Sequence, residues 1–226
     1  MKGVDLMSYY WTSYNPYSYY PYIPDPQQQV SYVRVFHASP DAPAVDVLVN
    51  NRPVATDLKY KEFTNYLPFY PGRYSIKVFP AGNRTNAVID TEVNVPPGSI
   101  YTLAAVGKLN EISLLPILDP RMPIPSGKVY IRFGHLSPNA PKVDVRLSDG
   151  TTLFRNVGFK EVTRYIPVDP GTYTLEVFPA GTNRRVLYVP NVTLKGNRFY
   201  TVYAVGLAGG RPPLQVLIPL DGNSYL

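Results

Sequence analysis

The stretch HASPDAPAVDV, residues 37–47, returns farther along the chain as HLSPNAPKVDV, residues 135–145. Both copies keep the His, the Ser-Pro, the Ala-Pro and the Val-Asp-Val. In the first copy the stretch follows the alternating run YVRVFH (32–37) and leads into VDVLV (45–49). Proline-containing segments between alternating runs are typical of turns between β-strands. The repeated stretch therefore predicts a corner between the first two strands of a duplicated β-fold.

The duplication extends over most of the 226 residues. PGRYSIKVFPAG (71–82) matches PGTYTLEVFPAG (170–181), and YTLAAVG (101–107) matches YTVYAVG (200–206). The copies lie 98 residues apart at the first block and 99 at the two later blocks. Such constant spacing predicts a tandem domain of about 90–100 residues. We expect an N-terminal arm (1–29), a first module (30–118), a proline-rich linker (119–127) and a second module (128–226).

Each module is predicted to be all-β. Turn signals such as Pro71-Gly72 and Pro96-Pro97-Gly98 separate short alternating runs, and no helical period extends over ten residues. The chain therefore predicts two tandem immunoglobulin-like antiparallel β-sandwiches of about seven strands each. Three prolines in the linker favour a preferred mutual orientation of the modules. In the first module we expect strands at 32–37, 45–49, 63–69, 73–79, 87–95, 99–107 and 111–118, and the prediction of strand direction below assumes one more short strand near 53–58.

Composition excludes several function classes. The chain has no Cys, which rules out disulfides, thiolate nucleophiles and Cys-based metal sites, and both of its His residues lie in the repeated stretch. No run of about 18 apolar residues predicts a membrane-spanning helix. The N-terminal sequence lacks the apolar core of a secretory signal, so we expect no export by the general route. No cofactor is expected.

The net charge of +6 belongs to the second half of the chain. Residues 1–29 carry −1, residues 30–120 carry 0 and residues 121–226 carry +7. This basicity favours an anionic polymer as a partner. Nucleic acid is not expected, because no dense Lys/Arg run interleaved with aromatic residues is present.

The first 29 residues differ in composition from the rest. They hold four prolines and only three charged residues among Ser, Asn, Gln and many aromatic side chains. Such low-complexity segments are typical of disordered but adhesive chain. One interpretation is an unstructured leader. The other is a self-association arm that stacks, adds as a strand to a neighbour's sheet edge or is cross-linked through oxidised tyrosine. The candidate assembly residues are Tyr9, Tyr10, Trp11, Tyr14, Tyr17, Tyr19, Tyr20 and Tyr22.

The repeated blocks carry a family resemblance. The pattern R-V-x-H-x-S-P-D-A-P-x-V-D-V from Arg34, followed by P-G-x-Y-x-x-x-V-F-P-A-G and Y-T-x-x-A-V-G, resembles a bacterial family catalogued as domain of unknown function 4397. The second copy departs from it at Gly134 and Asn139. The resemblance implies tandem β-sandwich modules on envelope or secreted proteins and no established activity. A Tyr-rich member without an export signal looks like a spore-surface or coat component.

The repeated stretch invites three interpretations. A catalytic triad needs the hydroxyl of Ser39 within reach of His37, but Ser-Pro is a turn-forming pair and no G-x-S-x-G motif is present. A weak calcium site through Asp41 and Asp46 loses one ligand in the second copy, where Asn139 replaces Asp41. The favoured interpretation is structural. In it the prolines fix the corner, the Asp accepts backbone N–H bonds and the His bonds a carbonyl.

Strand parity predicts where the repeated loops gather. If strands alternate in direction, the first, fifth and seventh run the same way, and the loops 37–43, 80–86 and 107–111 share one pole of the sandwich. The second module places loops 135–141, 179–185 and 206–211 there. Loops at one pole are the best location for a binding surface. The candidate residues are His37, Asp41, Asp46, Arg84, His135, Asp144, Arg184, Arg185 and Arg211.

We therefore expect a non-enzymatic structural and interaction protein of a bacterial surface layer, on the spore surface or cell envelope. Its expected partners are further copies of itself or other surface-layer proteins. The alternative is a carbohydrate- or wall-binding module that uses the loop pole, with an anionic glycan as ligand. A cytoplasmic location is the alternative to the surface.

Overall fold

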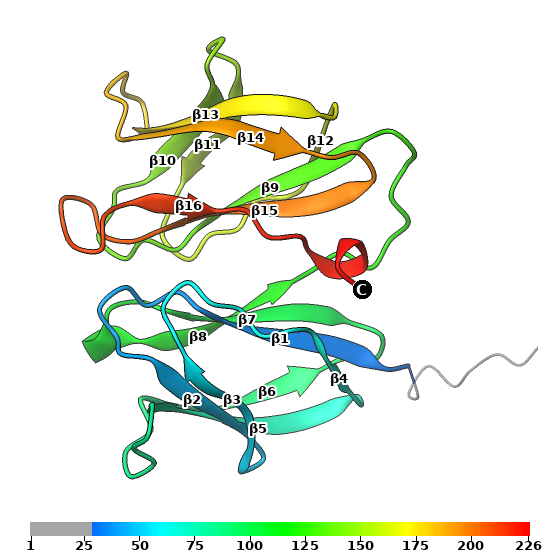
Figure 1. The fold of residues 1–226 in the computed structure, drawn as a ribbon, viewed down its shortest axis with the longest axis vertical. Coiled ribbons are helices and arrows are strands. Elements are labelled where there is room, and N and C mark those ends of the chain that lie inside the picture. The colour runs from blue at the N-terminus through cyan, green and yellow to red at the C-terminus, as the bar shows by residue number, and fades with distance from the viewer. Residues whose placement is uncertain (1–28) are drawn as a thin grey trace, which may run out of the picture.

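Strands dominate the molecule and form four four-stranded sheets, which pack in pairs as two β-sandwiches (Figure 1). The structure is a computed structural model that describes residues 29–226. The N-terminal arm, apart from Gln29, lies outside the described residues. Both sandwiches repeat the same strand order, so the tandem architecture predicted from the repeated blocks is confirmed.

The first module has eight strands and one short 3₁₀ helix. Its inner sheet has the order β4-β1-β7-β8, and its outer sheet has the order β3-β2-β5-β6. The elements are β1 (Ser31–His37), β2 (Val45–Val49), β3 (Arg52–Leu58), β4 (Leu67–Phe69), β5 (Gly72–Pro80), β6 (Ile89–Val95), β7 (Ile100–Val106), η2 (Leu109–Glu111) and β8 (Ser113–Leu118).

The second module repeats this plan. Its inner sheet has the order β12-β9-β15-β16, and its outer sheet has the order β11-β10-β13-β14. The elements are β9 (Val129–His135), β10 (Val143–Leu147), β11 (Thr152–Val157), β12 (Ile166–Val168), β13 (Gly171–Pro179), β14 (Leu187–Leu194), β15 (Arg198–Val205), β16 (Gln215–Leu217) and η3 (Gly222–Ser224).

One strand pair in each module differs from the expected antiparallel pattern. β1 pairs parallel with β7, and β9 pairs parallel with β15, whereas the other named pairs are antiparallel. After β1 the chain crosses to the outer sheet and comes back on the far side of β1 as β4. It later re-enters the inner sheet as β7 in the same direction as β1. The first and seventh strands therefore end at the same pole.

Several strands of the first module are shorter than the sequence predicts. The strand expected over 63–69 covers only β4, because Phe63 instead makes an isolated bridge to Phe36. The strand expected over 87–95 begins at Ile89. Phe36 and Phe63 lie with ring centroids 3.9 Å apart and nearly parallel. These rings belong to the contact between the two modules.

Each sandwich has its own apolar core between its sheets. Branched and aromatic side chains such as Val45, Val47 and Val78 in the first module, and Val143 and Val145 in the second, are almost fully buried. Every residue of β2 is buried, and so is nearly every residue of β1. A strand buried on both faces needs cover on both faces, and β1 receives it from its own outer sheet and from the other module.

The two inner sheets face each other and pack together (Figure 1). A third buried cluster joins Phe36, Ala104 and Ile117 of the first module to Leu136 and Tyr203 of the second. We expected separate beads oriented by a proline-rich linker. The modules instead share a buried face, and the segment between β8 and β9 contributes to it through Asp119, which pairs with Arg132. The mutual orientation is set by packing rather than by linker stiffness.

Candidate functional site

The histidine that both corners share bonds a backbone carbonyl. His37 Nε2 lies 2.9 Å from the Pro43 carbonyl and His135 Nε2 lies 3.0 Å from that of Pro141. A carbonyl only accepts, so Nε2 carries the proton in both rings. Both side chains are buried, and burial lowers the pKa of His37 and of His135. Neutral imidazoles therefore tie the corner across six residues, in the structural role expected from the sequence.

The aspartate of each corner holds an outer-sheet bulge and the neighbouring loop. Asp46 accepts the N–H of Asp57 at 3.0 Å and the N–H of Gly82 at 3.3 Å. Asp57 has a positive φ of 53° at a break in the β2–β3 register. A carboxylate that accepts the amide of such a residue stabilises the bulge locally. Asp144 accepts the equivalent amides of Asn156 and Gly181 in the second module.

Ser39 and His37 do not form a nucleophile–base pair. The Ser39 hydroxyl is buried and donates to the Gly107 carbonyl at 2.7 Å. Ser137 repeats this contact on Gly206 at 2.6 Å. The hydroxyl joins the corner to the end of the seventh strand, so it fixes backbone rather than facing the imidazole.

The third candidate acid also bonds backbone. Asp41 accepts the N–H of Leu109 at 2.9 Å, and Asn139 accepts that of Ala208 at 2.8 Å. An amide oxygen replaces a carboxylate oxygen without loss of the bond, which explains why the second copy tolerates Asn here. Within residues 29–226 no group of three His, Cys, Asp or Glu side chains is placed to hold a metal ion.

These contacts bring the three predicted loops together at one end of the first module. Asp41 links the corner to the 107–111 loop, and Asp46 links it to the 80–86 loop. Arg84 Nε lies 3.9 Å from Asp46 Oδ2 and is half exposed. We call these three loops, and their equivalents in the second module, the loop poles. At the first loop pole, Asp41 and Asp46 both accept hydrogen bonds from backbone N–H groups.

The second loop pole is hollowed and basic. Arg184, Arg185, Val186, Leu207–Gly210, Pro213 and Leu214 line a groove of about 510 Å³. Arg185 pairs with Glu176 and stacks over the Tyr188 ring, 4.5 Å from its centroid. Arg211 is exposed on the 206–214 loop but does not line the groove. The structure thus brings two of the three predicted arginines to one hollow.

A fourth arginine at the second loop pole, Arg146, was not among the residues predicted from the sequence. Arg146 reaches Asp144 at 3.3 Å, the Asn183 side chain at 3.0 Å and the Thr182 carbonyl at 3.1 Å. The residue in its place in the first module is Leu48. The guanidinium therefore binds the 179–185 loop to the corner in one module only.

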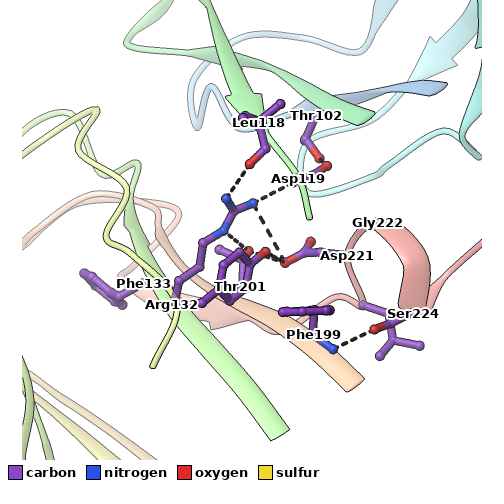
Figure 2. A network of polar contacts seen from close by, with 12 residues as sticks. Thr102, Leu118, Asp119, Arg132, Phe133, Phe199, Thr201, Asp221, Gly222 and Ser224 are labelled. Atoms are coloured by element: carbon purple, nitrogen blue, oxygen red, sulfur yellow. Dashed lines mark hydrogen bonds and ion pairs between the residues drawn. The ribbon is translucent and has the colours of Figure 1, made fainter. Parts of the chain in front are cut away.

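The other concentrated polar site lies between the modules, where sequence reasoning placed nothing. Arg132, on β9, donates through Nη2 to Asp119 Oδ1 at 2.5 Å and through Nη1 to the Leu118 carbonyl at 2.7 Å (Figure 2). Its Nε donates to Thr201 at 2.7 Å. The guanidinium of the second module thereby binds the last residue of β8 in the first module and the aspartate that follows it.

The first module returns the same contact. Arg34, on β1, donates through Nη2 to Asp221 Oδ1 at 2.6 Å, through Nη1 to the carbonyl of the preceding leucine at 2.8 Å, and through Nε to Thr102 at 2.8 Å. The two clasps are related by an approximate two-fold axis, as in an isologous dimer interface. All four charged side chains, those of Arg34, Arg132, Asp119 and Asp221, are almost fully buried.

Each buried aspartate is also held by its neighbours. Asp119 Oδ2 accepts the hydroxyls of Tyr66 at 2.6 Å and Thr102 at 2.5 Å. Asp221 Oδ2 accepts those of Tyr165 and Thr201 in the same way. Burial, with the nearby Asp119 carboxylate, raises the pKa of Asp221 to about 6, while the two guanidiniums oppose that rise. Charge-assisted bonds on every face keep the acids satisfied out of water.

At the centre of the interface the two modules are not symmetric, because a large aromatic side chain in one module corresponds to a small residue in the other. Phe36 and Tyr203 have ring centroids 5.3 Å apart. Their equivalents in the opposite modules are Gly134 and Ala104, respectively. A Cβ on Gly134 would lie 2.7 Å from the Tyr203 ring. The glycine at position 134, where the first copy has Phe36, is therefore a packing match to a large ring.

A signal for this interface was present in the repeats. Arg34 and Arg132 occupy the same position before the corner histidine, and an aspartate follows the last strand of both copies at Asp119 and Asp221. Within one copy, the arginine and the aspartate each have the pattern of an exposed charge at the edge of a strand. Because both copies repeat an arginine and an aspartate at equivalent places, the two copies together indicate a contact between the modules.

No described helix is long and apolar enough to cross a membrane. A comparison with curated proteins found no match. The family model described as domain of unknown function (DUF4397) matches residues 31–146 and 147–223. The division between the two matches falls inside β10, so it does not coincide with the division into modules.

The solved structures that the chain matches have low identity and low TM-scores. The Bacillus anthracis TIE protein is 14% identical, with a TM-score of 0.27, over 79% of this chain and 34% of that one. The CBM26-family domain CBMbc of Eubacterium rectale Amy13K is 11% identical, with a TM-score of 0.25, over 88% and 100%. A streptococcal virulence factor that binds alpha-glucan is 13% identical, with a TM-score of 0.23, over 78% and 92%. TM-scores this low carry no argument about function. The chain spans about a third of the TIE protein's length.

Proposed function

The chain belongs to the family of the domain of unknown function DUF4397, and we propose that it is a non-enzymatic structural protein of a bacterial surface layer. Its two modules act as one rigid unit, and its N-terminal arm joins units together. The location we propose is the spore surface or the cell envelope. The observation that supports this most is the doubly clasped module interface next to an aromatic-rich arm.

Rigidity follows from the interface. Two buried ion pairs, two guanidinium bonds to backbone carbonyls and an aromatic centre cross the interface, and they must break together before the modules can rotate. A building block of a lattice benefits from such a fixed shape, because assembly then costs no ordering of the modules. The corners that looked catalytic are used to hold backbone, which favours a structural role over an enzymatic one.

The arm supplies adhesion. It holds eight aromatic residues from Tyr9 to Tyr22, whereas the described modules present only a few scattered exposed apolar side chains. Aromatic side chains contribute large contact area at low cost in conformational entropy. The arm is therefore the part of the chain best suited to contact other copies.

The test is assembly with and without the arm. Deletion of residues 1–28 keeps Gln29, whose carbonyl accepts the Gly98 N–H. We expect the full chain to form oligomers or fibres in light scattering and electron microscopy, and the shortened chain to stay monomeric. A variant with Ser at the eight aromatic positions separates chemistry from length. Unchanged assembly of either variant would refute the assembly role.

A second candidate function is supported by the basic groove of the second loop pole. Arg184 and Arg185 line a hollow of about 510 Å³, a place where an anionic glycan would meet both charge and an apolar wall. The probe is an acidic polysaccharide such as polygalacturonate, with peptidoglycan alongside. We expect Arg184→Ala/Arg185→Ala to lose salt-sensitive retention. The matched control is Arg52→Ala/Arg73→Ala, which removes two exposed arginines of the first module.

Equal retention of both double variants would indicate nonspecific charge rather than a site. Retention that survives the Arg184→Ala/Arg185→Ala change and high salt would refute the glycan hypothesis at this groove.

A further inference from the structure

The two interface clasps differ in what covers them. Over the Arg34 clasp, η3 turns the chain back so that Tyr225 meets the Tyr66 ring edge-on, with centroids 5.3 Å apart. The Tyr225 hydroxyl donates to Asn65 Oδ1 at 2.7 Å, and the Gly222 N–H donates to the Tyr66 hydroxyl at 3.2 Å. A tyrosine side chain thus seals one of two related sites.

Over the Arg132 clasp, the related site is hollow. After Asp119 the chain leaves toward the linker, and the Tyr165 ring, which corresponds to Tyr66, meets Phe199 of its own module edge-on with centroids 5.1 Å apart. The hollow has a volume of about 410 Å³ and is mostly apolar, and its polar floor is Arg132 and Asp119. We call it the open cleft. Its walls include Leu118, Met122, Tyr130, Arg164, Tyr165 and Phe199.

The walls of the open cleft suit an aromatic ring with a hydroxyl. Tyr165 and Arg164 stand where Tyr66 and Asn65 stand around Tyr225. Tyr165 and Phe199, which meet edge-on, form an aromatic wall of the cleft. The exposed Arg164 can donate to a phenol oxygen where Asn65 accepts from one. Leu118 and Met122 are 59% and 55% exposed, so apolar side chains at the rim of the open cleft are in contact with water.

The N-terminal arm begins beside this cleft. Arg121 Nη1 donates to the Val30 carbonyl at 3.1 Å, and Arg121 directly precedes the cleft residue Met122. Tyr22, the nearest of the arm's aromatic residues, is eight residues before Val30. Eight extended residues span up to about 27 Å. This length allows Tyr22 to reach the open cleft from Val30. A segment tethered so closely has a millimolar effective concentration, which favours its own chain over a neighbour's.

We propose that the open cleft binds a tyrosine side chain of the N-terminal arm of the same chain, as the related site binds Tyr225. The bound ring packs on Tyr165 and its hydroxyl accepts from Arg164. This docking is a separate claim from assembly, since the arm can dock whether or not it also joins copies.

Met122 supplies a reporter at the rim. It is the only methionine of the described residues, and exposed methionine is oxidised by peroxide to the sulfoxide. A ring in the cleft shields its sulfur. The experiment measures the rate of Met122 oxidation by mass spectrometry, at dilutions where light scattering shows single chains. Three proteins are compared: the full chain, a variant without residues 1–28 and a variant with Ser at the eight aromatic positions of the arm.

We expect Met122 to oxidise about fivefold more slowly in the full chain than in either variant, as a weak contact at millimolar effective concentration would give. Arg164→Ala in the full chain should remove part of the protection. The matched control is Leu109→Met at the first loop pole, far from the cleft and 39% exposed, whose oxidation rate should be equal in all three chains.

Equal Met122 rates in the three chains would overturn the proposal, even if arm deletion abolished assembly. Protection that rises with chain concentration would also overturn it, because a neighbour's arm would then be the occupant. Protection of Met122 in single chains that do not assemble would support docking and refute the assembly role alone.

Discussion

The two modules agree at their shared face and differ at their free ends. Arg34 and Arg132 make the same set of contacts, down to the carbonyl before each aspartate. At the loop poles the first module has Leu48 where the second has Arg146, and the second has a longer 206–214 loop that helps to form a groove. Contacts that both copies need for packing have stayed alike. Surfaces that face outward have diverged, and that is where a function specific to one module belongs.

Breaking the shared clasps should have the largest effect. Arg34→Ala and Arg132→Ala each leave a buried aspartate without its ion-pair partner, and loss of one partner of a buried pair costs about 3–5 kcal/mol of unfolding free energy. We expect the cost to be larger for Arg34, whose site Tyr225 covers. Urea denaturation measures both.

The matched control for this prediction is Arg73→Ala, which removes an 81% exposed arginine paired with Glu92. It should change stability by less than about 1 kcal/mol. The double variant Arg34→Met/Asp221→Leu removes both charges and should recover much of the loss. A cost for Arg34→Ala no greater than that of the control would mean that the clasp does not hold the modules.

Gly134→Ala tests the asymmetric centre of the interface. The added Cβ would lie 2.7 Å and 2.9 Å from two Tyr203 ring atoms, so the ring must shift, at a cost of about 1–3 kcal/mol. Gly171→Ala is the control, because its Cβ would meet no atom closer than 3.6 Å. Thermal unfolding compares the two, and equal midpoints would contradict the packing explanation for this glycine.

The two corner histidines should make stability fall on acidification. Burial lowers the pKa of His37 and His135, so below the unfolded value of about 6.5 the unfolded chain binds more protons than the folded one. Stability is therefore full above that pH and is lost as pH falls toward the folded pKa, by at most about 1.4 kcal/mol per pH unit for each histidine.

Urea midpoints between pH 7.5 and 5 measure this effect as a difference between the wild-type chain and His37→Gln/His135→Gln. Glutamine keeps an N–H donor for the carbonyl but does not titrate. Parallel curves for the two chains would show that the corners do not sense pH.

Tyr203→Phe should have the smallest effect. Among the described residues the Tyr203 hydroxyl is buried without a hydrogen-bond partner, so its removal should be neutral or stabilise by up to about 1 kcal/mol. Tyr66→Phe is the contrast, because it takes a donor from Asp119 and should destabilise the chain. A larger loss for Tyr203→Phe than for Tyr66→Phe would reverse this assignment of roles.

The sequence predicted the modules because their signals are local. Alternation in YVRVFH and the prolines after His37 specify a strand and a corner without reference to distant residues. The convergence of the loops also followed from strand parity. The module interface was not predicted, because Arg34 and Asp221 are 187 residues apart. In addition, the alternation of residue types along a strand does not show whether its outer face contacts water or a second sheet. The size match of Gly134 to Tyr203 is likewise visible only once the sheets face each other.

The reciprocal clasp has a consequence for synthesis on the ribosome. Asp119 meets its partner Arg132 only 13 residues later, but Arg34 waits for Asp221, 187 residues farther along. Because domains emerge and fold in chain order, the first module completes its strands while one of its buried arginines still lacks an acid. The Arg34–Asp221 bond is thus made last, and a chain that stops before Asp221 leaves Arg34 without this acid. The contact between the modules is therefore complete only after the whole second module has been synthesised.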